Sequence, residues 1–279
     1  MPKSQFFLHP DNDVPIHRMD CPADLKDLAE PDAQARMRDL YHAPGILVLD
    51  DAIDPDWIER LRTGLSDQPR AFMDAFIDDK LPENADYKDA WKRTRKRIKR
   101  IGTALFGYEL PMDALAHSIR NMLTTDEPLH FDTYPVECGT FPVMGGTNFD
   151  VKPRIWRVGP NFPDACADDL DWTEAEIAKL AAGKSAGLPM RTKGLKGEGP
   201  LRPGIPLHEV HFAPGSVWFA NPKTLAHQIY YGNGVVFCQW DVREEGRPCA
   251  CQNCTLDALG IPADHLRIAP QDMASADAD

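Results

Sequence analysis

The sequence predicts a mainly β protein whose core is a double-stranded β-helix, or jelly roll, with flanking helices. From Thr124 to Val242, short apolar and β-branched runs alternate with Gly and Pro turn signals, which is typical of a sandwich or barrel. The preceding segment instead carries amphipathic helical patterns and one buried-strand pattern. Hydrophobic residues make up 43% of the 279 residues, enough for a sizeable buried core.

Composition excludes several function classes. A net charge of -12 argues against general nucleic-acid binding. No stretch approaches the roughly 18 apolar residues of a membrane span, and the N-terminus lacks the apolar region of a signal peptide. The seven cysteines are an odd number and mostly scattered, unlike a secreted disulfide framework. We therefore expect a cytoplasmic protein without a membrane span.

For the N-terminal part of the chain, the sequence predicts an arm that ends in a helix, followed by one strand and three further helices. Residues 1–43 are polar and are expected to form an arm that ends in a helix at Pro31–Tyr41. The apolar run within Pro44–Asp51 predicts a buried strand. Asp54 followed by Pro55 supplies an N-cap and a first-turn proline. The three helices after the strand are expected at Asp54–Leu65, Tyr87–Phe106 and Met112–Met122.

The remaining chain predicts the catalytic jelly roll and its insertions. A single domain is expected over residues 44–245, with a lid or insert at about 160–206 that holds a helix at Thr173–Ala182. Residues 246–279 form a cysteine-containing extension and a tail that we expect to be disordered. The expected strands are Pro128–Tyr134, Arg154–Val158, Glu209–Phe212, Ser216–Ala220, His227–Tyr230 and Val235–Val242.

Three residues form a candidate metal site. His130 and Asp132 are two apart on a predicted strand and so project to the same face, where both can reach one ion. His227 begins another predicted strand, and strands far apart in sequence are neighbours in a jelly roll. Two histidines and one carboxylate are the facial triad of non-haem Fe(II) oxygenases, which leaves positions open for co-substrate and O2. A closed zinc site would favour four N or S ligands.

Several motifs resemble the Fe(II)/2-oxoglutarate-dependent dioxygenases. Pro44–Leu61 is similar to the strand and capped helix that open many of these enzymes. The jelly-roll half is distantly similar to the Kdo hydroxylase branch, whose members act on a sugar acid of lipopolysaccharide. The motifs that carry this similarity are His130–Pro135, Pro153–Gly159, Phe212–Trp218, and His227 followed by Gly232.

The resemblance implies an activity and a ligand set. His130, Asp132 and His227 would be the iron ligands and catalytic residues. The co-substrates would be 2-oxoglutarate and O2, with hydroxylation of a small polar or sugar-acid-like molecule and release of succinate and CO2. Asp132 also favours hydroxylation over halogenation, because it occupies the iron position that a halide would need.

The cation that holds the distal 2-oxoglutarate carboxylate is not in its usual place. Many members of the superfamily carry an arginine at the position held here by Phe237. Gln239 and Arg243 share its face of the predicted strand. Arg154 and Arg157 are the alternatives, and on a regular strand only one of them can point inward. The resemblance favours Arg157 slightly.

Two other functions remain open. Phe237 in the arginine position favours a cupin-like metal enzyme that does not use 2-oxoglutarate. A non-catalytic, ligand-binding jelly roll, in which the histidines are incidental, is the other alternative. The sequence specifies no oligomeric state.

Two further clusters have competing interpretations. Lys92–Arg100 holds seven basic residues among nine, either a site for an anionic substrate or the solvated face of a helix. Cys249, Cys251 and Cys254 could be part of a zinc site completed by Cys21, Cys238 or a partner chain, or they could be free thiols. His208 and His211 are expected to face opposite sides of one strand and so not to bind one ion together.

Overall fold

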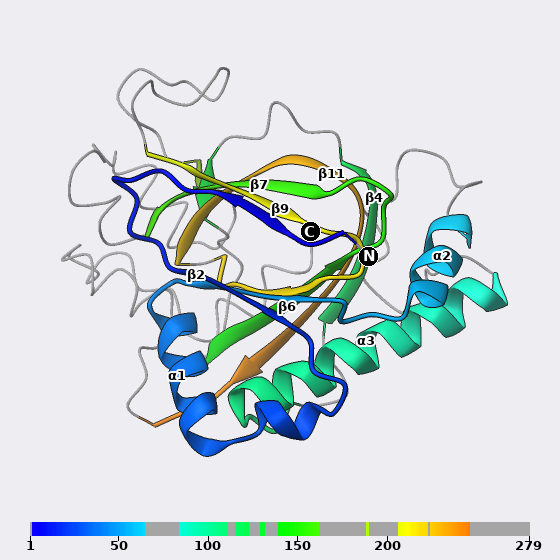
Figure 1. Cartoon of the computed structure of the whole chain (residues 1–279), viewed down its shortest axis with the longest axis horizontal. Coiled ribbons are helices and arrows are strands. Elements are labelled where there is room, and N and C mark those ends of the chain that lie inside the picture. Colours follow the sequence, from blue (N-terminus) through cyan, green and yellow to red (C-terminus); the bar gives the residue numbers. More distant parts are fainter. Residues whose placement is uncertain are drawn as a thin grey trace, which may run out of the picture.

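Two β-sheets share one long strand, β11 (Leu225–Val242), in the computed structural model of this chain (Figure 1). The first half of β11 pairs with β7 and β5, and the second half pairs with β4 and β6. β11 is therefore a central strand of both sheets. The structure describes residues 2–64, 84–110, 115–122, 129–131, 139–161, 188–189, 206–222 and 224–245.

Each sheet is antiparallel, except where β2 runs parallel to β3. We call the first sheet A; its strands follow the order β1 (Gln5–Phe7), β9 (His208–Phe212), β7 (Arg154–Asn161), β11, β5 (His130–Phe131) and β8 (Leu188–Pro189). Sheet B has the order β4 (Leu115–Met122), β11, β6 (Phe141–Asn148), β10 (Val217–Phe219), β3 (Ile46–Asp50) and β2 (Ile16–Asp20).

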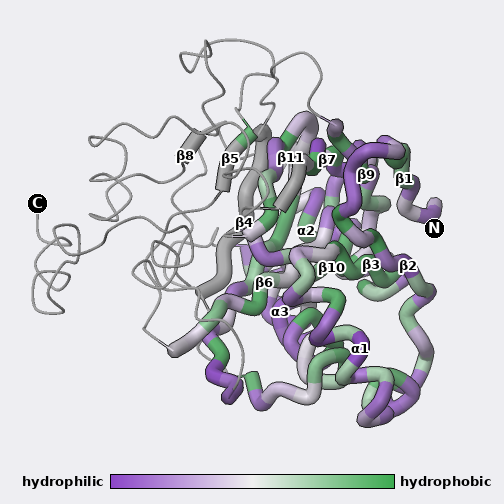
Figure 2. Tube along the Cα trace, turned by 90° about the vertical axis from the view of Figure 1, so that its left-hand side faces the viewer, coloured by the Kyte–Doolittle hydropathy of each residue, from purple (hydrophilic) through white to green (hydrophobic). Residues whose placement is uncertain are grey.

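Apolar side chains fill two separate layers, one on each face of sheet B. The apolar run of strand β3 is continuous because the strand is buried on both faces, and all five of its residues are buried. Ile46 and Val48 face sheet A, whereas Leu47 and Leu49 face the helices. Sheet B is thus covered on both faces. Figure 2 shows the resulting layers, with sheet A above, sheet B in the middle, and α1 and α3 below.

Three α-helices and a short 3-10 helix cover the outer face of sheet B. The α-helices are α1 (Pro31–His42), α2 (Pro55–Gly64) and α3 (Ala85–Phe106), and the 3-10 helix is η1 (Leu25–Leu28). Helix α3 begins where the Asn84 side chain accepts a hydrogen bond from the Tyr87 amide. It ends at Gly107, which has a φ of 73°. Its buried stripe includes Trp91, Ile98, Ile101 and Leu105. No helix in the described part of the chain is long and apolar enough to cross a membrane.

The predicted jelly-roll fold and most predicted elements are confirmed. Strand β3 and helices α1 and α3 lie where the sequence predicts them. Helix α2 begins at Pro55, and the Asp54 carboxylate accepts a hydrogen bond from the Asp56 amide at 2.9 Å, as the N-cap prediction requires. The predicted helix at Thr173–Ala182 and the C-terminal tail lie outside the described residues.

The predicted helix at Met112–Met122 is wrong. Residues Leu115–Met122 form strand β4, which pairs with β11 from Gly232 to Gln239. The local spacing of apolar residues favours a helix, but pairing with the central strand overrides that preference.

The predicted N-terminal arm is not separate from the sheets. It contributes β1 to the edge of sheet A and β2 to the edge of sheet B. Neither strand shows a clear apolar alternation, because edge strands expose most of their side chains.

Candidate metal centre

The two predicted histidine ligands lie opposite each other in sheet A. His130 on β5 and His227 on β11 are direct partners in the antiparallel register. Directly opposed residues of such a pair have Cβ atoms about 4.5–5.5 Å apart. The fold thus brings together two positions that are far apart in the sequence.

The tautomer of His227 follows from its backbone contact. Its Nδ1 lies 3.1 Å from the carbonyl oxygen of Leu225, which can only accept a hydrogen bond. Nδ1 therefore carries the proton, and the lone pair of the neutral ring lies on Nε2. The side chain is buried, and its ring lies 5.2 Å from that of Trp156 at an interplanar angle of 31°. A carbonyl partner of this kind is characteristic of metal-binding histidines.

The third predicted ligand, Asp132, lies outside the described residues. Within the described ranges, no group of three or more His, Cys, Asp or Glu residues is placed to hold a metal ion. The triad therefore stays a prediction, with two of its backbone positions in register.

Arg154 is the predicted anchor that points into the molecule. It is only 1% exposed, and its guanidinium carbon lies 5.4 Å from the ring centroid of Phe237. A Cβ added at Gly232 would overlap the Nη1 of Arg154 and lie 2.8 Å from its guanidinium carbon. The cation therefore lies against β11, beside Phe237, which occupies the usual arginine position.

The other three predicted anchors lie elsewhere. Arg157 faces the outer side of sheet A, over the ring of Tyr230 at 3.8 Å and 3.6 Å from a Glu209 oxygen. The two arginines thus face opposite ways, as predicted, but the inward one is Arg154 and not the favoured Arg157. Gln239 contacts Asp241 near the end of β11, and Arg243 is exposed beyond that end. Along the strand, Gln239 is about 40 Å from His227, at roughly 3.3 Å per residue.

His208 and His211 face opposite sides of β9, as predicted. His208 is buried, and its Nδ1 accepts a hydrogen bond from the His9 amide while its Nε2 donates to the carbonyl of Val14. Burial lowers the pKa of His208 below its ordinary value. His211 contacts Glu209 on the outer side. His211 therefore lies outside the layer that holds Trp156.

The basic segment Lys92–Arg100 lies on α3, across sheet B from His227. The buried side of α3 packs into the outer layer with Phe219 and Cys238. His227 instead contacts Trp156, which belongs to the layer between the sheets. The basic side chains therefore do not line the candidate metal centre.

The described cysteines do not form a metal cluster. Cys238 is buried, and burial raises its thiol pKa to about 12. Cys21 contacts the guanidinium of Arg97 at 3.5 Å. Cys249, Cys251 and Cys254 lie outside the described residues.

Sequence reasoning missed two residues that shape the site. Trp156 lies within the Pro153–Gly159 motif, and its ring packs against that of His227. Gly232 follows His227 in one of the motifs, and it leaves space for the guanidinium of Arg154. Its position beside Arg154, on the neighbouring strand, has no signal in the local sequence.

Structural comparison identifies the fold. No family model matches the chain, and no curated protein matches its sequence. Among solved structures, the Kdo hydroxylase KdoO in complex with alphaketoglutarate and Fe(III) matches with a TM-score of 0.61 at 14% identity, over 88% of this chain and 96% of that one. The chain has the fold of Kdo hydroxylase. The apo structure of the same enzyme matches with a TM-score of 0.57 at 14% identity, over 95% of this chain and 96% of that one. The predicted distant resemblance is thereby confirmed at the level of the fold.

Proposed function

We propose that this protein is an Fe(II)- and 2-oxoglutarate-dependent dioxygenase that hydroxylates a small polar or sugar-acid-like molecule. The observation that carries the proposal is the register of His130 opposite His227. KdoO, which shares the fold, is described as a non-heme Fe(II) alphaketoglutarate dependent dioxygenase. The products would be a hydroxylated substrate, succinate and CO2. We place the enzyme in the cytoplasm and leave open whether its substrate is anionic.

The residues fit an iron ion. His227 presents Nε2 as a buried nitrogen donor whose tautomer is fixed by the Leu225 carbonyl. His130 would add a second imidazole from the opposing position, and Asp132 the carboxylate. Two histidines and a carboxylate suit Fe(II) and leave coordination positions open. When bound, the metal would supply the O2-dependent oxidation of 2-oxoglutarate and substrate.

Arg154 is the residue that we assign to the distal carboxylate of 2-oxoglutarate. It lies on the same face of β7 as Trp156, two residues away, and Trp156 contacts His227. The buried guanidinium beside Phe237 can grip a carboxylate through two parallel hydrogen bonds. In this role Arg154 would replace the arginine that is absent from position 237, and the chain would still have an anchor for 2-oxoglutarate.

The apolar layer would protect the reaction from water. Trp156, Phe212 and Trp218 form a contiguous aromatic group, with centroid distances of 4.3–6.0 Å. Because Trp156 packs against the His227 ring, this group also fixes the orientation of the imidazole. A dry pocket strengthens the contact between Arg154 and a carboxylate.

The metal site is tested by anaerobic titration with Fe(II). We expect one iron per chain, and His227→Ala should lower the affinity at least about a hundredfold, because even outer-shell partners contribute 10- to 100-fold. His130→Ala and Asp132→Ala should do the same. The exposed His17 supplies the matched control, and His17→Ala should bind iron as the wild type does.

The outcomes separate the alternative functions. Iron binding that survives His227→Ala would contradict the assignment. Bound iron without succinate formation from 2-oxoglutarate would indicate a metal enzyme that does not use this co-substrate. No stoichiometric iron would indicate a non-catalytic jelly roll.

The co-substrate anchor is tested with two arginines of one strand. Arg154→Met should raise the KM for 2-oxoglutarate roughly 10- to 100-fold, the equivalent of losing charge-assisted hydrogen bonds. Arg157→Met is the control and should leave this KM unchanged, because Arg157 faces the outer side of sheet A. The reverse pattern would assign the anchor to Arg157.

A further inference from the structure

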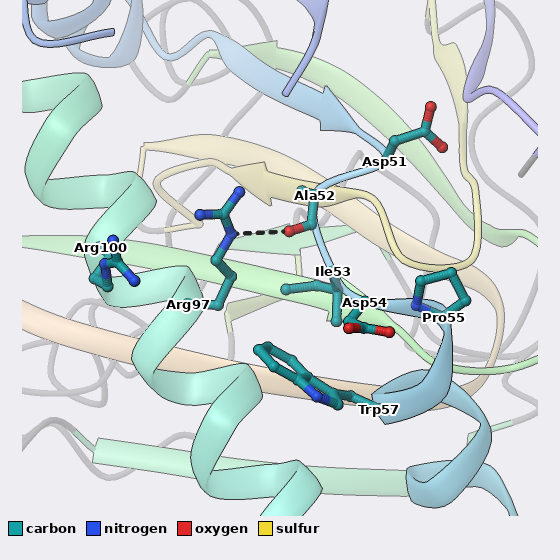
Figure 3. Close-up of a pocket in the computed structure, with 8 residues that line it drawn as sticks. All are labelled: Asp51, Ala52, Ile53, Asp54, Pro55, Trp57, Arg97 and Arg100. Atoms are coloured by element: carbon teal, nitrogen blue, oxygen red, sulfur yellow. Dashed lines mark hydrogen bonds between the residues drawn. The ribbon is translucent and has the colours of Figure 1, made fainter. Parts of the chain in front are cut away.

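A pocket of about 580 Å³ lies on the helical side of the molecule, far from the candidate metal centre. Helix α3 contributes Arg97 and Arg100, and the loop from β3 into α2 contributes the opposite wall (Figure 3). Trp57, in the first turn of α2, forms the third side. The volume is within the range of about 300–1,000 Å³ that small-molecule sites occupy.

The two arginines have no anionic partner among the residues that the structure describes. Arg97 donates from Nε to the carbonyl oxygen of Ala52 at 3.1 Å, which fixes the guanidinium at the pocket wall. Its Nη2 lies 3.5 Å from the sulfur of Cys21. Arg100 is exposed and forms no ion pair within the described part of the chain. Three residues apart on a helix, the two side chains are neighbours and can bind one anion together.

The carboxylates that line the pocket are already engaged. Asp51 forms an ion pair with Lys3 at 2.7 Å, which compensates its charge. Asp54 accepts a hydrogen bond from the Asp56 amide as the cap of α2. Arg97 and Arg100 supply the cations that line the pocket, whereas the exposed lysines 92 and 96 of the same helix lie outside its lining.

We propose that this pocket binds a small organic molecule through a phosphate group. The guanidinium groups of Arg97 and Arg100 would hold the phosphate, and the organic part would pack against Trp57. A pocket of this volume is larger than a phosphate alone requires, so an organic part fits beside it. The chain has a net charge of -12, so a local basic site of this kind would also attract anions selectively to one face.

This site is independent of the proposed oxygenase chemistry. Sheet B separates the pocket from the layer that holds Trp156 and His227. A phosphate compound should therefore bind with the same affinity in the His227→Ala variant as in the wild type.

Calorimetric titration with phenyl phosphate, inorganic phosphate and benzyl alcohol tests the proposal. Phenyl phosphate should bind one per chain and more tightly than inorganic phosphate, while benzyl alcohol should not bind. Arg100→Gln should weaken phenyl phosphate binding roughly tenfold, since charge-assisted hydrogen bonds contribute about that much. Because Arg100 is exposed, this variant should fold normally; Arg97→Lys, which retains the charge, provides the second measurement.

Two matched controls define the result. Lys92→Gln and Lys96→Gln remove one exposed charge each from α3 without touching the pocket lining, and binding should be unchanged. If either control weakens binding as much as Arg100→Gln, the basic face attracts anions diffusely and the proposal fails. Trp57→Phe should abolish the change in tryptophan fluorescence that accompanies binding; an undiminished change would place the ligand elsewhere.

Vesicles distinguish a soluble ligand from a lipid surface. Phosphatidylcholine vesicles containing phosphatidic acid should not sediment the protein. Sedimentation that falls equally in Lys92→Gln, Lys96→Gln and Arg100→Gln would assign the basic face to a membrane surface and overturn the pocket assignment.

Discussion

The chemistry of the candidate centre depends on a few residues whose side chains are oriented by neighbouring backbone. The carbonyl of Leu225 holds the proton of His227 on Nδ1, so the ring presents its other nitrogen. On β7, alternation places Arg154 inside and Arg157 outside. Gly232 then provides the space that the Arg154 guanidinium fills. The backbone and the neighbouring residues that orient these side chains take no part in the chemistry themselves.

The substitution Gly232→Ala, which adds a single methyl group, tests whether Gly232 provides the space for Arg154. The added Cβ would overlap the guanidinium of Arg154 and displace it. If Arg154 binds 2-oxoglutarate, we expect the KM for this co-substrate to rise about tenfold or more, the equivalent of a charge-assisted hydrogen bond. Iron affinity should not change. An unchanged KM, measured by succinate formation, would contradict the assigned role of Arg154.

The sequence predicts the site residues only in part. His130 and His227 could be found because their residue types and predicted strands suit a metal site, and the register now pairs them. Whether Arg154 or Arg157 points inward depends on the register in which β7 pairs with its neighbouring strands. The sequence of β7 alone does not specify that register. The pocket at Arg97 and Arg100 needs two helices and a loop that the sequence does not place together.

At the scale of secondary structure, strand β6 shows how dense packing can hide an element. Gly145 and Gly146 lie in mid-strand, where glycine pairs suggest a turn, so the sequence predicts no strand there. A Cβ at Gly145 would lie 2.8 Å from Ile98 of α3, and one at Gly146 would lie 2.7 Å from Trp218. Gly145 and Gly146 face opposite sides of sheet B, and the packing on each side leaves no room for a side chain. By contrast, α2 and α3 carry their own caps and apolar stripes, and were therefore predictable.

Gly146→Ala should lower the free energy of unfolding by about 1–3 kcal/mol, the usual effect of overpacking a core. The new methyl group would press on the rings of Trp218 and Phe237. Urea denaturation measures the change. Combining it with Phe237→Leu should recover part of the loss by making room; a purely additive loss would show that the methyl group is accommodated elsewhere.

At the scale of the whole molecule, the N-terminal arm joins the two sheets. Asn12 donates to the carbonyls of Val158 and Pro206 at 2.9 and 3.1 Å. Buried Asp50 on sheet B accepts hydrogen bonds from the amide and hydroxyl of Ser4, whose oxygen accepts from the Ala213 amide. His208 bonds the arm at both ring nitrogens. The arm is thus part of the fold.

His208 should make this attachment sensitive to pH. Burial lowers its pKa in the folded state, so the unfolded chain binds the proton first as pH falls. The stabilisation is present above the unfolded pKa of about 6.5 and is lost as pH falls below it. Protonation of Nδ1 would also remove the acceptor for the His9 amide.

The measurement is urea denaturation at about pH 7 and pH 5, which bracket the ordinary histidine pKa. The wild type should lose more stability between these values than His208→Gln does. His17→Gln, at an exposed position of the same arm, should behave like the wild type. Equal losses in the wild type and His208→Gln would show that other groups cause the acid sensitivity.

Strand β11 belongs to both sheets, and this affects the hydrogen exchange of its amides. Its residues from Val235 to Gln239 lie between β4 and β6, and the same strand continues into sheet A at His227. Opening this segment would break its pairing with two strands of sheet B at once, so these amides should exchange with solvent only through global unfolding. The strand that carries His227 would then be the last part of the chain to lose its protection.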